Sequence, residues 1–480
     1  MLYTACKSFI RPGARTNVSV LAAVHFLTFT LLVSSFCNFF DPLFSPLFKS
    51  TLSSSGQLFT GTAYSKDLSG LSFTSEIIAG FSEAEITPEE ETTMGGYGTF
   101  FINRRFTRLS KGTHDPLLAS IAIFKTSVSS RPVFMISLDL VGLSPALENR
   151  IREQIRKYIG RDFDLLVSAT HTHASPDTVG LWGALPSSGV DPDYLDEISA
   201  KIGKAAFEAM GTAEKVSVSH STGEILNTSD DPEVNAVSNT FWFERANGEV
   251  KATLTQWNAH PTVLGGDNHY FSAGFVGPFR AYMSKKFPGT HLYFNGILGG
   301  VFPPDLAPAA EDPFETENGS IYDPGVELSV YLQMTAVGKA LSDNIFAQYA
   351  QKSPVNLSKG LQVKRFDFSV NNDNFLYRLA MRLDILEDRG HRSSVIESHF
   401  SVFDFGEFSF LAIPGESFSE PYKILAKAVK RKNVIPIGIA GDWLGYIMTE
   451  DQYNDPEYDY FKTLSPSAEA LSKMLEAVNQ

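Results

Sequence analysis

An apolar run that ends in two histidines constrains the fold more than any other stretch of this chain. Residues 163–169 (FDLLVSA) are mostly apolar, and Thr170-His171-Thr172-His173 follow directly. A short apolar run of this kind is typical of a buried strand. Side chains alternate with a period of two in an extended backbone, so we expect His171 and His173 to point to the same side and to reach one centre. The simpler alternative is two polar residues hydrogen-bonded to neighbouring backbone, because a His-x-His pattern is short and common.

Strand-like and helix-like segments alternate around this run. Residues 132–140 are apolar enough for a strand that is buried on both faces, as in a sheet covered by helices. Apolar residues recur at four-residue spacing over 147–159, and Gly160 stands where a helix would end. Asp191, followed by proline, has the residue type of a helix N-cap. This order predicts an α/β fold with a mixed, largely buried sheet flanked by helices.

Four later strand-like segments also end in polar or glycine-rich turns. They are residues 252–259, 291–294, 408–413 and 434–440. Ligands of open α/β sheets bind outside the carboxyl ends of the strands, so we expect a metal site there. The polar side chains at these ends are those of His171, His173, His260, Glu416 and Tyr446. Two histidines and a carboxylate with an open position suit a catalytic zinc ion, which activates water and polarises a carbonyl group.

A set of short motifs between about residue 77 and residue 460 occurs in an order that resembles one known family. The chain is similar to the amino-terminal catalytic domain of the neutral/alkaline non-lysosomal ceramidases, as a divergent member. The matching stretches are Ala79-Gly80-Phe81, Ile86-Thr87-Pro88, His114-Asp115-Pro116-Leu117, Ser137-Leu138-Asp139-Leu140, Ala169-Thr170-His171-Thr172-His173, His260-Pro261-Thr262, Pro414-Gly415-Glu416 and Gly445-Tyr446.

The resemblance implies a role for each of the candidate site residues. The zinc ligands would be His171, His260, Glu416 and Tyr446, and His173 would stand beside the metal and move a proton. The implied activity is zinc-dependent hydrolysis of an N-acyl amide bond by metal-activated water. The implied substrate is ceramide, a related N-acyl lipid or a small amide.

The chain departs from the family pattern at three positions. The family's Gly-Asp-Val-Ser-Pro element matches residues 299–303, where Gly300 replaces the aspartate and Phe302 replaces the active-site serine. Its Ser-Ala-Asp element ends here in Gly274. A phenyl ring cannot donate a hydrogen bond to an oxyanion. Two interpretations therefore stay open: an active zinc amidohydrolase, or a catalytically weak or inactive binding protein that retains the fold and the metal.

The amino-terminal residues predict export. Lys7, Arg11 and Arg15 precede an apolar stretch over residues 18–40, which is typical of a signal peptide or a membrane anchor. We predict a signal peptide or anchor over 1–40, a tether over 41–73 and a ceramidase-like zinc hydrolase domain over 74–480. The protein would be periplasmic, extracellular or membrane-anchored.

The charge of the chain restricts its partners. The formal net charge is -14, which argues against nucleic acid as a partner because phosphate binding requires concentrated lysine and arginine. The expected partners are a small-molecule or lipid amide substrate and, through the amino-terminal segment, a membrane. The sequence leaves the oligomeric state open.

Overall fold

The computed structural model describes most of the chain after residue 73. The described residues are 74–98, 107–184, 186–229, 231, 236–315, 321–386 and 394–480, and they belong to one compact unit, Leu68–Gln480. The predicted leader (1–40) and tether (41–73) lie outside the described residues. Among the helices that are described, none has the length and apolar character needed to cross a membrane.

A nine-stranded mixed sheet forms the main scaffold. Its strands β10 and β8 at one end, and β4 and β5 at the other, are parallel pairs, whereas the other neighbours are antiparallel. This confirms the predicted α/β fold with a mixed sheet. The strands follow the order β10 (Thr290–Asn295), β8 (Val250–Trp257), β7 (Val237–Glu244), β6 (Glu214–Glu224), β1 (Glu76–Glu85), β3 (Leu118–Lys125), β4 (Val133–Leu138) and β5 (Asp164–Ala169), with β11 (Ser353–Pro354) paired to β6.

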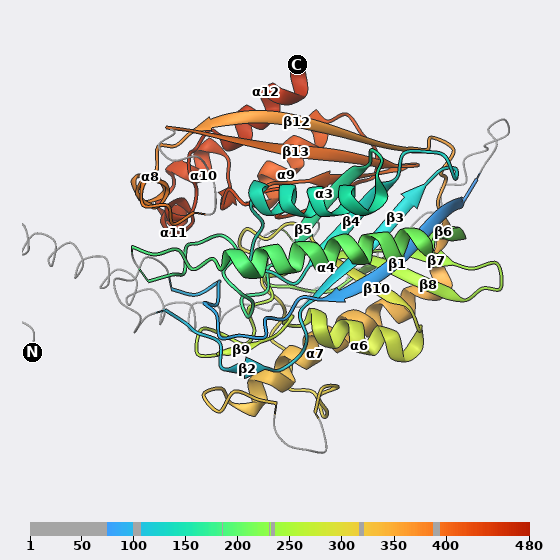
Figure 1. Cartoon of the computed structure of the whole chain (residues 1–480), viewed down its shortest axis with the longest axis horizontal. Helices are drawn as coiled ribbons and strands as arrows, with labels where there is room; N and C mark the ends of the chain where they lie inside the picture. Colours follow the sequence, from blue (N-terminus) through green and yellow to red (C-terminus); the bar gives the residue numbers. More distant parts are fainter. Residues whose placement is uncertain are drawn as a thin grey trace, which may run out of the picture. The chain divides into compact units, whose positions relative to one another are not determined.

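A second sheet of four strands packs against one face of the main sheet. It contains β12 (Leu361–Asn371), β13 (Val395–Phe405), β14 (Phe408–Ala412) and β16 (Val434–Ile437), and Figure 1 shows β12 and β13 running along one side of the main sheet. Two short parallel ladders, β15 (Glu416–Ser417) with β17 (Tyr446–Ile447) and β2 (Gly112–Thr113) with β9 (Tyr270–Phe271), complete the strands of the described part.

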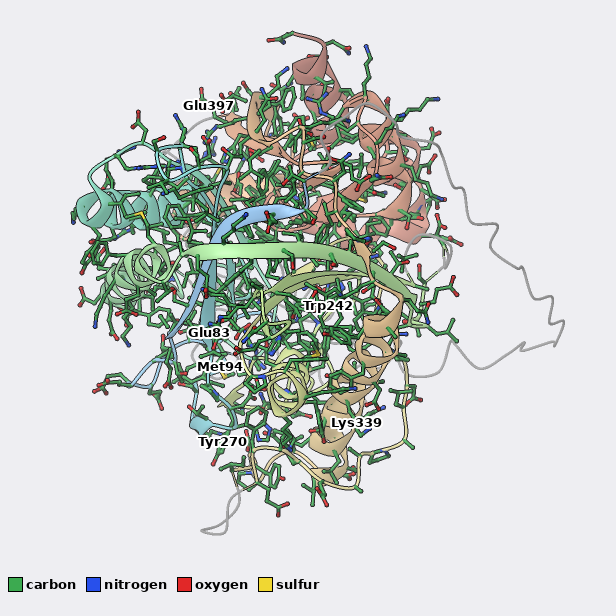
Figure 2. All side chains as sticks on the ribbon, turned by 90° about the vertical axis from the view of Figure 1, so that its right-hand side faces the viewer. Glu83, Met94, Trp242, Tyr270, Lys339 and Glu397 are labelled. Carbon is green, nitrogen blue, oxygen red and sulfur yellow. The ribbon has the colours of Figure 1, made fainter. Side chains whose placement is uncertain are left out.

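Helices cover the two outer faces of this pair of sheets. The main sheet is covered by α3 (Pro145–Ile159), α4 (Pro192–Gly211), α6 (Val276–Lys286) and α7 (Leu328–Gln348), and Figure 1 shows α3 and α4 side by side over the strands. In Figure 2, Trp242 of β7 lies inside the molecule beside α7. The second sheet is covered by α9 (Ser419–Ala428) and α12 (Ala470–Asn479). The remaining helical segments are α8 (Phe375–Arg382), α10 (Glu450–Asn454), α11 (Asp459–Thr463), η2 (Tyr349–Gln351) and η3 (Pro456–Tyr458).

The alternation of side chains along β3 explains why both faces of the main sheet are apolar. Ile121 and Ile123 pack in the core that includes α3 and α4, whereas Ala122 and Phe124 pack against the second sheet. The ring of Phe124 lies 5.2 Å from that of Phe405 in the second sheet. The prediction of a largely buried sheet is therefore confirmed, but a sheet rather than helices covers one of its faces. An apolar strand has the same composition under either cover.

Local capping signals place the two predicted helices. The Ser144 hydroxyl accepts the N–H of Leu147 at the start of α3, and Gly160 ends that helix with φ 60°. The Asp191 carboxylate accepts backbone N–H groups at the start of α4. Each cap satisfies groups that the helix itself leaves unpaired. The sequence predicted the end of α3 at Gly160 and the start of α4 at Asp191, whereas the cap at Ser144 was not predicted.

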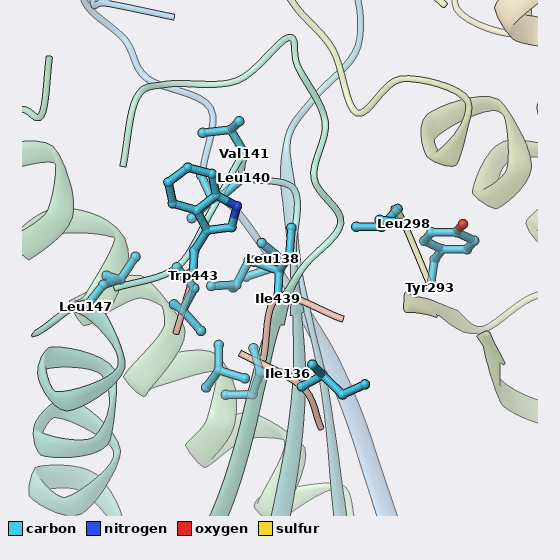
Figure 3. Close-up of a cluster of buried hydrophobic side chains, with 14 of the residues drawn as sticks. Ile136, Leu138, Leu140, Val141, Leu147, Tyr293, Leu298, Ile439 and Trp443 are labelled. Carbon is cyan, nitrogen blue, oxygen red and sulfur yellow. The ribbon is translucent and has the colours of Figure 1, made fainter. Parts of the chain in front are cut away.

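Residues just after β16 join the second sheet to the end of β5. The carbonyl of Ile439 accepts the N–H of Ala169 at 3.1 Å, and the N–H of Ile439 donates to Gly415 at 3.1 Å. Figure 3 shows Ile439 packed with Leu138 and Ile136 of β4. One residue thus connects the segment that precedes His171 to the turn that carries Glu416.

Candidate metal centre

His171 and His173 meet immediately after β5, although not in the way that the strand pattern predicted. The strand ends at Ala169, and His171 has φ 66°, in the left-handed region that few non-glycine residues adopt. This bend brings Nε2 of His173 to 3.0 Å from Nε2 of His171. The predicted convergence is confirmed, but its expected cause, an extended backbone, is wrong because hydrogen bonds after the strand turn the chain.

Backbone carbonyl groups orient two of the histidine rings. Nδ1 of His171 donates to the carbonyl of Val141, and Nδ1 of His260 donates to that of Val301 at 3.0 Å. A carbonyl oxygen only accepts hydrogen bonds, so Nδ1 carries the proton in each ring. In the neutral imidazoles, both Nε2 atoms therefore present lone pairs, as metal-binding histidines do.

Glu416 adds a carboxylate oxygen to these nitrogen atoms. Its Oε2 lies 2.9 Å from Nε2 of His260 and 3.4 Å from Nε2 of His171, and all three side chains are buried. Burial opposes ionisation of Glu416, but the positive charge and hydrogen bonds that His171 and His260 supply when protonated outweigh it and hold the pKa of Glu416 well below its usual range. With neutral imidazoles, three acceptor atoms face one another, and such a group requires a cation, either added protons or a metal ion.

Tyr446 lies beside Glu416 because the two residues are paired in register in the β15–β17 ladder. Residues in register on parallel strands point to the same face of the ladder. Burial, followed by the charge of Glu416, raises the pKa of the Tyr446 hydroxyl well above its usual value. Tyr446 is accordingly a buried phenol that a nearby cation would help to ionise.

His173 completes a group of three histidines that can hold a metal ion. The ligand atoms of His171, His173 and His260 all lie within 4.8 Å of one another. Nitrogen and carboxylate donors of this kind fit zinc as well as other divalent transition metals. The structure thus brings together His171, His173, His260 and Glu416 and places Tyr446 next to Glu416. The division of these residues into ligands and a proton carrier stays a prediction.

His173 differs from the other two histidines in its surroundings. Burial, followed by the neighbouring His171 and His260, lowers the pKa of His173 well below its usual value. Its Nδ1 is buried and has no hydrogen-bond partner among the described residues. A neutral imidazole with an unengaged nitrogen can accept a proton.

A glycine-rich loop packs against the ring of His173, and the buried Arg108 binds the backbone carbonyl of His173. The sequence pattern did not reveal the arginine. Gly96 has φ 101°, and a Cβ atom there would lie only 2.4 Å from Cγ of His173. Arg108 donates to the carbonyl groups of Gly95 and His173, and to that of Asn268 at 3.0 Å. Burial lowers the pKa of Arg108 to about 10, so it stays charged at neutral pH. The Gly95-Gly96 pair was the one available signal that backbone approaches closely here.

Phe302 lies at the outer edge of the histidine group. Its ring stacks on that of His260, with centroids 5.3 Å apart and an interplanar angle of 27°, and the residue is 36% exposed. Gly300 and Gly274 both have positive φ values, 71° and 65°. The position that the resemblance assigned to a serine thus presents an apolar ring beside the candidate metal ligands.

Comparisons with known proteins identify the fold. No family model and no curated protein matches the sequence. Among solved structures, the chain is similar to neutral ceramidase from Pseudomonas aeruginosa, with a TM-score of 0.67 and 15% identity over 84% of this chain and 74% of that one. It is also similar to a ceramidase complexed with C2, with a TM-score of 0.64 and 14% identity over 84% of this chain and 75% of that one. The chain therefore has the fold of the neutral ceramidases, with a buried histidine group able to hold a metal.

Proposed function

We propose that this protein is a zinc-dependent hydrolase of an N-acyl amide bond, in ceramide, a related N-acyl lipid or a small amide. The proposed zinc ligands are His171, His260, Glu416 and Tyr446. The observation that carries the proposal is the convergence of Nε2 of His171, Nε2 of His260 and Oε2 of Glu416, with each histidine oriented by a backbone carbonyl. The two ceramidases that share the fold support the substrate class.

Each residue of the group has a definite task in this reaction. A bound zinc ion would supply a Lewis acid that polarises the amide carbonyl and lowers the pKa of water. His173, which is neutral, takes up the proton of the attacking water and returns it to the leaving nitrogen. Phe302 forms an apolar wall beside His260 against which an acyl chain can pack.

The proposal extends to the location of the protein. The basic residues and the apolar stretch within 1–40 support export, to a periplasmic, extracellular or membrane-anchored position. The hydrolase domain would then span 74–480 and act near a membrane that carries a lipid amide. Recovery of the full-length protein from the soluble cytosolic fraction would contradict this part of the proposal.

A second candidate function is that of a metal-retaining binding protein with little or no catalytic activity. Phe302 favours it, because its ring occupies the place of a hydroxyl donor next to His260. Loss of one oxyanion donor typically costs about 2.7 to 4 kcal/mol, which is roughly a hundred- to a thousandfold in rate.

The deciding experiment combines metal analysis with an amidase assay on the purified protein. Bound zinc is measured by elemental analysis, and hydrolysis of ceramide and of shorter N-acyl amides is followed before and after chelation and zinc replacement. We expect one zinc per chain in the wild type, and loss of most of it in His171→Ala and in Glu416→Ala. The variant His220→Phe is the control, because His220 lies among Phe241 and Phe408 and belongs to no part of the histidine group.

The outcomes separate the two functions. Chelator-sensitive hydrolysis that zinc restores supports the hydrolase, whereas stoichiometric zinc without turnover of any amide supports the binding protein. Stoichiometric zinc in both alanine variants would show that the proposed ligands are wrong.

A further inference from the structure

The two oxygen atoms of the Glu416 carboxylate have different surroundings. Oε2 faces His171 and His260, whereas Oε1 accepts the indole N–H of Trp443 at 2.9 Å. Glu416 and Trp443 are both buried, so little water competes for this hydrogen bond. A carboxylate with one oxygen occupied by a donor has the other oxygen available for a metal ion.

We propose that Trp443 is a positioning residue of the metal centre, whose indole N–H orients Glu416 so that Oε2 alone is presented to the metal. This inference rests on the proposed zinc site and deepens it. Groups that hydrogen-bond to metal ligands orient them and tune their affinity for the metal. Without the N–H donor, the carboxylate can rotate and present either oxygen or both.

The position of Trp443 is itself fixed by neighbouring contacts. Its backbone N–H donates to Oδ1 of Asp442 at 2.6 Å, and the hydroxyl of Ser398 on β13 donates to Oδ2 of Asp442 at 2.6 Å. Figure 3 shows the indole beside Leu140 and Val141, and the carbonyl of Val141 is the group that orients His171. Trp443 thus contacts Glu416 directly and packs beside Val141, the residue that orients His171.

The segment between β16 and Tyr446 contains one non-glycine residue in the left-handed region, and two glycines that adopt this region without strain. Ile439 has φ 47°, unusual for a β-branched residue, and Gly441 and Gly445 have φ 76° and 70°. A Cβ atom at Gly445 would lie 1.7 Å from the carbonyl oxygen of Leu464. Strain at non-glycine residues clusters at functional sites, and Ile439 lies between β16 and Tyr446.

The alternative is that Trp443 serves only as core packing, in which case its N–H would be dispensable. The neighbouring Trp182 provides the matched comparison. Its ring lies 6.3 Å from that of Trp443, and its Nε1 is buried without a hydrogen-bond partner among the described residues. Replacement of either tryptophan by phenylalanine removes an indole from the same cluster, but only one replacement removes a hydrogen bond to Glu416.

The test compares the full-length wild type with Trp443→Phe and Trp182→Phe. Zinc affinity is measured by competition with a chromophoric chelator, and the geometry of the site is followed by the visible absorption of the cobalt-substituted proteins. We expect Trp443→Phe to bind zinc about 10- to 100-fold more weakly than the wild type and to show a changed cobalt spectrum. Trp182→Phe should keep the wild-type affinity and spectrum, even if it unfolds at a lower temperature.

Each result counts for or against the inference. Equal zinc affinity and equal cobalt spectra of Trp443→Phe and the wild type would overturn it, whatever the effect on stability. Absence of zinc binding by the wild type would overturn the proposed metal centre and this inference with it. If Trp443→Phe does not fold, the test uses the indole N–H resonances of the wild type instead. Addition of zinc must then shift the resonance of Trp443. The resonance of Trp257 is the control and must stay unchanged, because its Nε1 has no partner among the described residues. An unshifted Trp443 resonance would overturn the inference.

Discussion

His171 combines an unusual backbone conformation with a candidate role in metal binding. Its φ of 66° turns the chain directly after β5, and its Nδ1 donates to Val141. A left-handed conformation costs a non-glycine residue roughly 1–2 kcal/mol, which the surrounding contacts must offset. The position of the His171 ring thus depends on the backbone conformation as well as on the hydrogen bond of its side chain.

Phe302 carries the first prediction at the scale of single residues. We expect slow or absent hydrolysis of long-chain ceramide by the wild type and a roughly hundred- to thousandfold faster rate in Phe302→Ser combined with Gly300→Asp, because a hydroxyl donor is introduced beside His260. Aspartate is among the residues that tolerate the positive φ of Gly300. Rates are measured on zinc-loaded preparations with ceramide and with a short N-acyl amide.

Phe302→Ala in the same Gly300→Asp background separates the two effects of the ring. The alanine removes the ring without adding a hydroxyl group. It should therefore improve the access of the substrate to the histidine group and leave the chemical step slow. Efficient ceramide hydrolysis by the wild type, unchanged in the serine variant, would contradict this account of the substitution.

We expect the buried side chain of His291 to make the folded protein less stable in acid. Its Nε2 donates to the carbonyl of Phe287 and its Nδ1 accepts from the hydroxyl of Thr253, and burial lowers its pKa to about 4. The unfolded chain binds this proton near pH 6.5 and the native one does not, so the stabilising contribution is present above that pH and is lost as the pH falls towards 4. The loss amounts to about 3 kcal/mol.

Urea unfolding at pH 7 and at pH 4.5 measures this contribution. The wild type should lose more free energy of unfolding between the two pH values than His291→Gln, which has no proton to bind. An identical pH dependence of the two proteins would show that His291 is not responsible.

The glycine-rich loop before residue 98 shows how one element can support the site without contributing a ligand. Gly96 lies against the ring of His173, and Arg108 holds the loop in place through the carbonyl of Gly95. The close approach of backbone to an imidazole leaves no room for a side chain.

Gly96→Ala should therefore displace the loop or His173 and reduce amide hydrolysis by far more than it reduces thermal stability. Gly248→Ala is the matched control, because Gly248 also has a positive φ, 83°, but its added Cβ atom would meet nothing within 4 Å. Both variants carry the backbone cost of alanine at positive φ, about 1 kcal/mol. Equal activity in the two variants would show that the loop has no part in positioning His173.

At the scale of the whole molecule, the site depends on both sheets. His171 and His260 follow strands of the main sheet, whereas Glu416 and Tyr446 belong to the segments around β14 and β16. The second sheet also covers the apolar face that contains Phe124 and Phe243. A chain that ends before the second sheet would lose two of the proposed ligands and expose that face to water.

We therefore expect a fragment of residues 74–300 to be aggregated or unfolded and to bind no stoichiometric zinc, whereas residues 74–480 fold cooperatively and bind it. Circular dichroism during thermal unfolding and elemental analysis test both pieces. A cooperatively folded, zinc-loaded 74–300 fragment would contradict the proposal of one indivisible domain.

Much of this architecture was readable in the linear sequence because its signals are local. The apolar run before His171, the four-residue spacing up to Gly160 and the cap at Asp191 each report on one strand or helix end. Hydrophobic period and capping act over a few residues, so a sequence pattern can reveal them without knowledge of the fold. The sequence also singled out His171, His173, His260 and Glu416 as polar residues near strand ends, whereas their meeting at one centre is decided by the tertiary structure.

Other features depend on contacts between residues that are far apart in the chain. No local pattern distinguishes a strand covered by helices from one covered by a second sheet, since both are apolar throughout. The hydrogen bond from Trp443 to Glu416 and the contacts of Arg108 with Gly95, His173 and Asn268 arise only when distant segments pack. The left-handed turn at His171 is imposed in the same way, by the bonds of its backbone and ring to Leu140 and Val141. Residue types and their periods thus specify the elements, whereas the orientation of the candidate ligand atoms is set by long-range packing, because the groups that hold them have no fixed spacing in the sequence.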